Sequence, residues 1–463
     1  MLEFLIEYLP LVMFAVLAIL LFSGYPVAFI LGGIALLFAV LGDLAGTFRL
    51  QQLTLIPLRI YGGTMESLVL VAIPMFTFMG TMLEKSGAAR DLLYALQVML
   101  RRVPGGLALS VTLMGTIMAA TTGIIGASVV MITLMALPVM MKAGYSMPLA
   151  TGTIASSGTL GILIPPSIML VIMSDLLSVP VGTVFIAALM PGLLLAALYF
   201  VYLLVICRFK PQLAPPMDDD MGPSTRGEFW AMIFRSFLPP IFLILCVLGS
   251  IFLGFATPTE AAGVGAFGSI LLAAFNRQLN WENFVEVCKR SALTVAMLFG
   301  IFVGATAFAF VFKSIGGEHL IVDFINASSA GPWSILIVLL AMVFFLGFFF
   351  DWIEITLIVL PIFAPIVGLL DFGGHVGDWD GISQPIIIWF LILVAVNLQT
   401  SFLTPPFGFA LFYMKGVAPP EVRIQDIYKG IIPFVMLQVF GLMLCVAFPS
   451  IVLWFPSYML GGG

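Results

Sequence analysis

Charged side chains are scarce in this chain. Only 9% of its 463 residues are Asp, Glu, Lys or Arg, whereas 62% are hydrophobic and the mean hydropathy is +1.20. A soluble domain carries about 25% charged residues, so the composition excludes an ordinary soluble protein. We expect a chain that lies within a lipid bilayer and has no nucleic-acid partner.

Cysteine and histidine are also rare. The four cysteines lie far apart, so neither a disulfide framework nor a CxxC metal site is indicated. Both histidines, His319 and His375, fall in predicted loops, which argues against a haem or a histidine-ligated metal. The sequence has no HExxH motif, and Asp218-Asp219-Asp220 has no second acidic motif with which to form a magnesium site. These absences disfavour an intramembrane enzyme.

Long apolar stretches run through the whole chain, and about 20 such residues suffice to cross a bilayer. They predict ten crossings, at residues 5 to 22, 26 to 44, 66 to 83, 147 to 177, 182 to 206, 231 to 253, 257 to 275, 291 to 312, 386 to 414 and 430 to 454. Two further apolar segments, 105 to 141 and 332 to 368, are interrupted by Thr121 to Gly126 and by Gly347 to Asp351. We predict that each is a re-entrant hairpin.

The basic residues set the orientation, because cytoplasmic loops are enriched in Lys and Arg. If the first hairpin and the central loop face the cytoplasm, 15 of the 18 basic residues lie inside. Only Arg49, Arg59 and Lys313 then lie outside. This arrangement places the hairpins on opposite faces and both termini outside.

Two halves of the sequence resemble each other in order. Thr133 to Pro138 matches Thr356 to Pro361 at an offset of 223, and Pro165-Pro166 matches Pro405-Pro406 at an offset of 240. Weaker pairs are Pro26 with Pro258 and Pro191 with Pro433.

These matches predict a first repeat at 1 to 207, a cytoplasmic linker at 208 to 228 and a second repeat at 229 to 463. Since each repeat holds five crossings, the second enters from the opposite face. We therefore expect an all-α polytopic membrane protein with inverted-topology repeats, two re-entrant hairpins and two broken helices, which is typical of secondary transporters.

The two Pro-Pro segments are the predicted working centre. Proline removes a helical hydrogen bond, and the freed carbonyl groups must face protein, water or an ion when they lie in lipid. Carbonyls near Gly161 to Pro165 and Phe402 to Pro405 provide oxygen ligands that suit a sodium ion. Hydroxyl groups in the same regions belong to Ser128, Ser167, Thr400, Ser401 and Thr404.

A substrate carboxylate is expected between the breaks, because the half-helices that follow them point positive dipole ends inward. The candidate substrate-binding residues are Ser128, Ser167, Thr404 and Phe407.

Three polar residues near the second break have alternative interpretations. Asp351 is either part of a cation site, as an acid at membrane depth suggests, or an acid at the outer mouth that reaches water. Asn397 either hydrogen-bonds the hairpin or binds an ion. Glu260, in Thr257-Pro258-Thr259-Glu260, is predicted to cap the start of a helix.

These segments resemble the large membrane subunit of the tripartite ATP-independent periplasmic (TRAP) transporters, and the resemblance covers nearly the whole chain. The matching segments are Ala72 to Phe76, Gly123 to Ser128, Gly144-Tyr145, Gly158 to Ile168, Thr257 to Ala261 and Asn397 to Gly408. Many members have two serines after the hairpin glycine, whereas Ala127 precedes Ser128 here.

The resemblance implies an elevator-type transporter of the bacterial inner membrane that couples organic-anion import to a sodium gradient. Its partners would be a small four-span membrane subunit and a periplasmic substrate-binding protein. Two sodium sites are implied. Gly126, Ser128, Gly161 and Pro165 would form one, and Asp351, Asn397, Thr400, Thr404 and Pro406 the other.

One rival interpretation is a single-component sodium/carboxylate carrier that needs no binding protein. A simple channel fits less well, because hairpins that enter from opposite faces suit alternating access.

Overall fold

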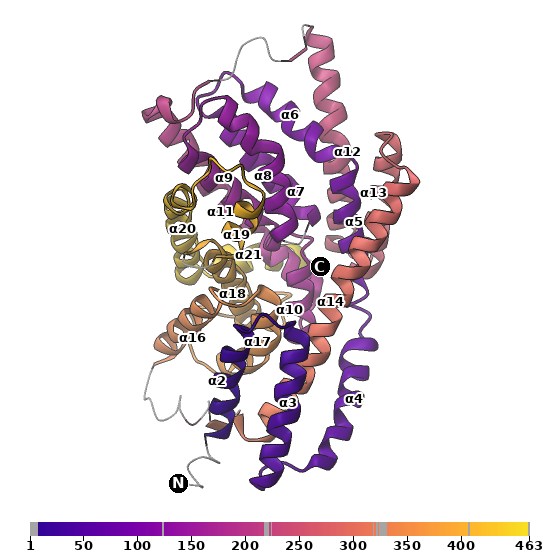
Figure 1. Cartoon of the computed structure of the whole chain (residues 1–463), viewed down its shortest axis with the longest axis vertical. Coiled ribbons are helices and arrows are strands. Elements are labelled where there is room, and N and C mark those ends of the chain that lie inside the picture. The colour runs from indigo at the N-terminus through magenta and orange to yellow at the C-terminus, as the bar shows by residue number, and fades with distance from the viewer. Residues whose placement is uncertain are drawn as a thin grey trace.

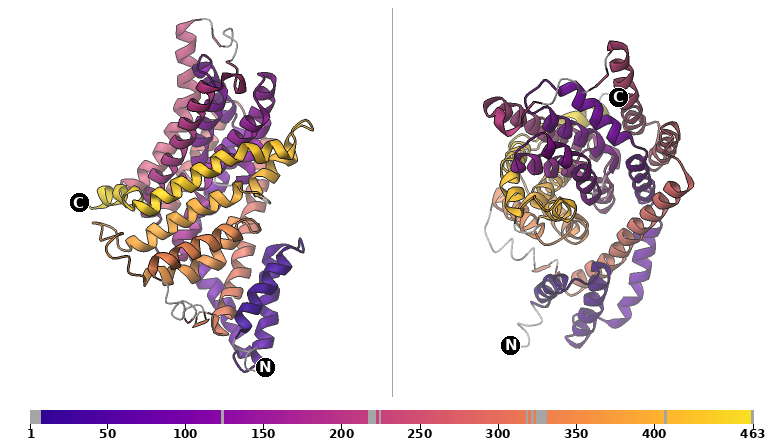
Figure 2. Two further views of the ribbon diagram at one scale, coloured as in Figure 1. Left: turned by 90° about the vertical axis from the view of Figure 1, so that its left-hand side faces the viewer. Right: turned by 45° about the horizontal axis from the view of Figure 1, so that its top comes forward.

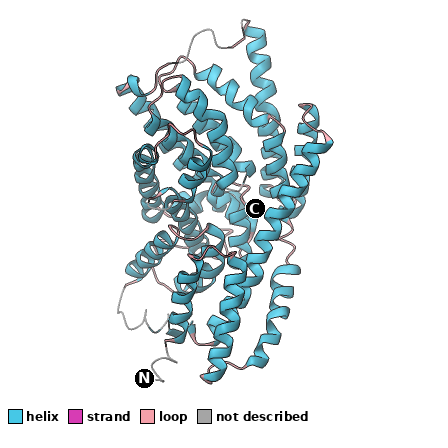
Figure 3. Cartoon of the chain, viewed as in Figure 1, coloured by secondary structure: helices cyan, strands magenta, loops and turns pink. Residues whose placement is uncertain are grey.

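The computed structural model describes residues 8–122, 125–216, 222–223, 225–317, 319–320, 323, 331–405 and 408–461. Within these ranges the chain forms helices and connections and no strand (Figure 3). In the first half of the chain the helices are α2 Leu9–Leu21, α3 Val27–Leu44, η1 Leu50–Thr54, α4 Leu55–Ile60, η2 Tyr61–Met65, α5 Ala72–Lys85, α6 Ala88–Leu100, α7 Gly106–Thr122, α8 Ile125–Lys142, α9 Met147–Thr159, η3 Leu160–Ile162, α10 Ile168–Leu176, α11 Val181–Phe209 and η4 Pro211–Leu213. In the second half they are α12 Arg226–Phe252, α13 Pro258–Phe275, α14 Trp281–Ser314, α16 Pro332–Leu346, α17 Trp352–Gly368, α18 Pro385–Leu403, α19 Phe409–Val417, α20 Ile424–Ala447 and α21 Ser450–Leu460.

The helices coincide with the apolar stretches of the sequence. In the described part, 8 helices are long and apolar enough to cross a membrane. The predicted crossings at 147 to 177 and 386 to 414 are each broken into two helices, α9 with α10 and α18 with α19, as the Pro-Pro segments indicate.

Several boundaries differ from the prediction, among them the starts of α5 at Ala72 and α14 at Trp281. The crossing expected at 430 to 454 divides, because α20 ends at Ala447 and Pro449 precedes the start of α21. Residues 50 to 65, for which no element was predicted, form the short helices η1, α4 and η2. None of these three is long enough to stand out as an apolar stretch of its own.

Four helices form what we call the framework group: α3, α5, α13 and α14. Among the described helices, the most extensive contacts are those of α13 with α5 and of α14 with α3, which lie side by side in Figure 1. Glycines allow the close approach, since a Cβ on Gly304 would lie 2.5 Å from the carbonyl oxygen of Ala28. Thr259 Oγ1 also donates to the carbonyl of Leu68 (2.8 Å), and Asn276 Nδ2 donates to that of Ser86 (3.1 Å). Both ends of α13 are therefore tied to the α5 region.

A second set, the broken-helix group, consists of α7 to α10 and α16 to α20. Its orange and yellow helices, α16, α18 and α20, lie side by side in the left view of Figure 2. Gly152 of α9 and Gly430 of α20 bring two backbones into contact, because a Cβ on Gly430 would lie 2.0 Å from the carbonyl oxygen of Pro148. Among the 8 candidate spans of the described part, α18 is the most enclosed, with 89% of its most apolar window buried, so protein surrounds it where lipid would otherwise be.

The predicted cap at Glu260 is confirmed. Thr257 Oγ1 accepts from the Glu260 backbone N–H (3.3 Å), and a Glu260 carboxylate oxygen accepts from that of Thr257 (2.8 Å). This reciprocal pair is a capping box, with Pro258 at the first helical position.

Candidate functional site at the two broken helices

The first break lies between α9 and α10. Helix α9 passes into the short turn η3, which contains the buried Gly161, and α10 begins after Ser167. The Ser167 hydroxyl donates to the carbonyl of Ile162 (2.6 Å). Within the described residues, the carbonyls of Leu163, Ile164 and Pro165 accept no hydrogen bond, although all three residues are buried.

Hairpin 1, formed by α7 and α8, packs beside this break. Val129 of α8 lies against Gly158 at the end of α9, where a Cβ would come within 2.6 Å of the valine side chain. Ser128, which precedes Val129, is buried. Gly126 lies two residues before Ser128, in the same turn of α8. The predicted hairpin residues Gly126 and Ser128 are thus near the first break. Gly123 and Ile124 lie outside the described residues.

The second break follows Leu403 at the end of α18. The Thr400 hydroxyl donates to the carbonyl of Val396 (3.0 Å), and the Thr404 hydroxyl donates to that of Thr400 (2.8 Å). Within the described residues, no hydrogen bond reaches the carbonyl oxygens of Phe402 or Leu403, both fully buried. Two residues predicted for this site, Pro406 and Phe407, lie outside the part of the chain that the structure describes.

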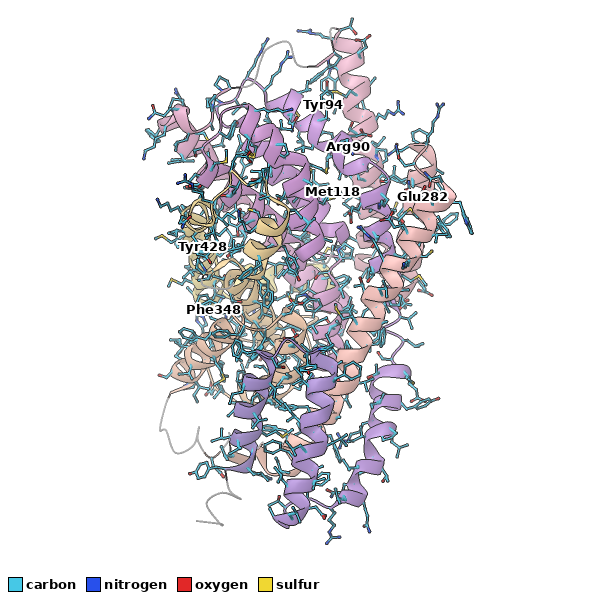
Figure 4. All side chains as sticks on the ribbon, in the orientation of Figure 1. Arg90, Tyr94, Met118, Glu282, Phe348 and Tyr428 are labelled. Carbon is cyan, nitrogen blue, oxygen red and sulfur yellow. The ribbon has the colours of Figure 1, made fainter. Side chains whose placement is uncertain are left out.

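Hairpin 2, formed by α16 and α17, rests directly on α18. A Cβ on Gly347, in the same turn as the labelled Phe348 of Figure 4, would lie 2.0 Å from the Ser401 hydroxyl oxygen. Asn397 Nδ2 donates to the carbonyl of Leu340 in α16 (2.7 Å). The amide nitrogen of Asn397 therefore hydrogen-bonds the hairpin, which is one of the two roles considered for this residue. Only its amide oxygen can act as a cation ligand.

Asp351 caps helix α17. Its Oδ1 accepts from the backbone N–H of Trp352 (2.8 Å), and its own N–H donates to Glu354 Oε2 (3.1 Å). Glu354 is 7% exposed and faces a small apolar cavity that Phe14 and Leu17 of α2 also line. Among the described residues, no hydrogen bond links Asp351 to Asn397 or Thr404. The Asp-x-x-Glu pattern of a capping box was the sequence signal for this role.

Gln399 was missed by the sequence reasoning. Its Nε2 donates to Thr159 Oγ1 at 3.4 Å, and both residues are fully buried. Its Oε1 has no hydrogen-bond partner among the described residues. Because 399 exceeds 159 by 240, the offset that separates the Pro-Pro segments, this contact joins corresponding positions of the two broken helices. The repeat offset would have identified it.

Tyr413 of α19 was also missed, and no local sequence signal marks it. A Cβ on Gly126 would lie 3.0 Å from its ring. This aromatic side chain of α19 therefore contacts hairpin 1, in keeping with the packing of α19 on α8.

The donor groups at both breaks fit a sodium ion. They are buried carbonyl oxygens without hydrogen bonds, together with hydroxyl and amide oxygens, and half-helices that end in such groups can coordinate Na⁺. An unpaired carbonyl in the bilayer is costly, so a cation would relieve a defect that the fold itself creates.

Comparison with known proteins places the chain in a family. A profile described as "Tripartite ATP-independent periplasmic transporter, DctM component" matches residues 14–451. The chain is 29% identical over 400 residues to the C4-dicarboxylate TRAP transporter large permease protein of Pseudomonas aeruginosa, which covers 86% of this chain and 88% of that protein. It is 26% identical over 448 residues to the sialic acid TRAP transporter large permease protein of Vibrio cholerae, covering 96% of this chain and 97% of that protein.

A solved structure, the YdaH transporter of Alcanivorax borkumensis, shares the fold with a TM-score of 0.58 at 12% identity, over 86% of this chain and 89% of that chain. The extent of the family match confirms the resemblance seen in the sequence, and the named relatives are transporter permeases rather than enzymes. The chain therefore belongs to the DctM component family of the tripartite ATP-independent periplasmic transporters, as a multi-pass membrane permease.

Proposed function

We propose that this chain is the large permease of a sodium-coupled importer of an organic anion. One observation carries the proposal: both broken helices present buried carbonyl groups that accept no hydrogen bond from the described residues, and a hairpin packs beside each break. The first sodium ion binds at Gly126, Ser128, Gly161 and Pro165, and the second at Asn397, Thr400, Thr404 and Pro406. Asp351 joins the second site through Oδ2, since its Oδ1 accepts the hydrogen bond from the Trp352 backbone N–H that caps α17.

The substrate binds between the two breaks, beside Ser128, Ser167, Thr404 and Phe407. The names of the relatives, which mention C4-dicarboxylates and sialic acid, support an organic anion. A periplasmic binding protein delivers this anion, and a small four-span membrane subunit completes the complex in the inner membrane, with both termini of this chain outside.

Reciprocal helix contacts support inverted repeats. The Pro26 and Pro258 pairing makes α3 the counterpart of α13, and α5 the counterpart of the second part of α14. The contact of α3 with α14 then corresponds to the contact of α13 with α5, with the two repeats interchanged. In the same way, the contact of α10 with α17 corresponds to that of α19 with α8. Each half-helix after a break thus contacts the second arm of the opposite repeat's hairpin, and we propose that the broken-helix group moves as an elevator against the framework group.

Uptake into proteoliposomes tests the proposal. The permease is reconstituted with its membrane partner, and a panel of organic anions is offered with and without the binding protein and an inward sodium gradient. Uptake should need both. Uptake that persists without any cation gradient would overturn the sodium mechanism. Uptake without the binding protein would instead favour the single-component carrier.

A further inference from the structure

A second candidate site is a cavity whose lining includes none of the unpaired carbonyl groups of the two breaks. It has a volume of about 410 Å³ and is bounded by α4 and η2, by the end of α10, by α14 and by α17. The polar residues that line it are Arg59, Thr64, Asp175, Thr306 and Lys313. Helix α14 belongs to the framework group, and α10 and α17 belong to the broken-helix group. An occupant would therefore contact both groups.

Basic side chains outnumber acidic ones among the described residues that line this cavity. Arg59 and Lys313 contribute two cations and Asp175 one anion. Asp175 already accepts a hydrogen bond from the Ser67 hydroxyl (2.7 Å). In contrast, Arg59 lies over the Phe310 ring, 4.7 Å from its centroid, and forms no hydrogen bond or ion pair within the described ranges. Its guanidinium is held by the ring while its N–H donors stay available.

The distribution of basic residues along the sequence also sets these two cations apart. Arg59 and Lys313 are two of only three basic residues that the charge distribution places on the outer face. A membrane protein that excludes Lys and Arg from its outer loops, yet keeps two of them in one cavity, has concentrated positive charge where an anion would enter. A volume of about 410 Å³ is also within the range of small-molecule sites.

We propose that this cavity binds an organic carboxylate on the outer side of the permease, with the Arg59 guanidinium as its anchor. For the substrate class and the direction of entry, this inference rests on the proposed function. The same oxyanion chemistry is found in the headgroup of an anionic phospholipid, so the experiment must separate the two sources.

Binding is measured on the purified full-length permease in phosphatidylcholine nanodiscs, without a gradient or a binding protein. Succinate and pyruvate are titrated at constant ionic strength against chloride, with the thermal unfolding midpoint as the readout. At least one carboxylate should raise the midpoint of the wild type. Arg59→Ala should need an about tenfold higher carboxylate concentration for the same rise in midpoint, because it loses one charge-assisted hydrogen bond. The carboxylate concentration that Arg59→Lys needs should lie between those of the wild type and Arg59→Ala.

Arg49→Ala is the matched control, because Arg49 is also an exposed basic residue assigned to the outer face and does not line the cavity. It should behave as the wild type. A carboxylate effect that is absent from the wild type, or equal in the wild type and Arg59→Ala, would overturn the proposal. So would Arg59-dependent stabilisation by added phosphatidylglycerol with none by the carboxylates. Because no sodium gradient is used, failure of sodium-driven uptake would refute the proposed function separately.

Discussion

Single residues at the two breaks combine structural and functional demands that can be separated by substitution. Asp351 provides a helix cap and a charge, and Gln399 provides one hydrogen bond and one unpaired oxygen. A capping side chain can be replaced by another that caps equally well, whereas a charge cannot.

Asp351→Asn should keep the fold and weaken the sodium dependence of uptake. Asparagine caps helices about as well as aspartate, so the thermal midpoint should change little, while Asp351→Ala should cost about 1 kcal/mol. Sodium titrations of uptake measure the functional effect. Thr257→Ala, which removes the corresponding cap of α13 away from both breaks, is the control. A sodium requirement unchanged in Asp351→Asn would reduce Asp351 to a cap.

Gln399→Met should preserve or raise stability and lower uptake. Methionine has a similar length and removes a buried acceptor whose lack of a partner costs about 1–3 kcal/mol. The substitution also removes the hydrogen bond to Thr159, which is the polar link between the two broken helices. Thermal unfolding and initial uptake rates are measured on the same preparation. Normal uptake at unchanged sodium affinity would show that the link has no role in transport.

At the scale of helices, the seating of hairpin 2 on α18 depends on the absence of one side chain. Gly347→Ala should impair uptake severely, because its Cβ would lie 2.0 Å from the Ser401 hydroxyl oxygen. Adding Ser401→Gly should restore part of the activity by vacating that space. Gly331→Ala, at the other end of α16 where a Cβ meets nothing within 4 Å, should be nearly silent. If the double variant is no better than Gly347→Ala, the contact is not the cause.

Helices and breaks could be predicted from the sequence because their signals are local. Hydropathy located the apolar helices, and proline chemistry located the breaks at 165–166 and 405–406. The helix cap at Asp351 was open to prediction too, but the predicted depth of this acid in the membrane suggested a cation site instead. Tyr413 could not have been found, because its contact with Gly126 joins segments far apart in sequence. The domain boundaries and the sodium ligands stay predictions.

At the scale of the whole molecule, the proposed elevator requires the framework group to stay together while the broken-helix group moves. Ala28 of α3 and Gly300 of α14 offer a test, because a Cβ on Gly300 would lie 3.6 Å from that of Ala28. This is close to the Cβ separation of about 3.8 Å in a disulfide. The pair Ala28→Cys and Gly300→Cys should cross-link in a variant without the native cysteines.

Oxidised protein should transport as well as reduced protein, with mass spectrometry confirming the bond. Loss of uptake on oxidation, restored by reductant, would mean that α3 and α14 must separate during transport.

The buried carbonyl groups without partners also make the stability of this fold depend on its ionic surroundings. A ligand that binds only the folded state adds a stabilisation of about 2.7 kcal/mol at one hundred times its dissociation constant. Replacing sodium by potassium should therefore lower the thermal unfolding midpoint of the purified permease, and the sodium titration of that midpoint would report affinity with no substrate or partner present. An identical midpoint in both salts would contradict cation binding at the breaks. The driving ion would then be part of what holds the protein together, and a cell deprived of sodium would lose permease molecules as well as their driving force.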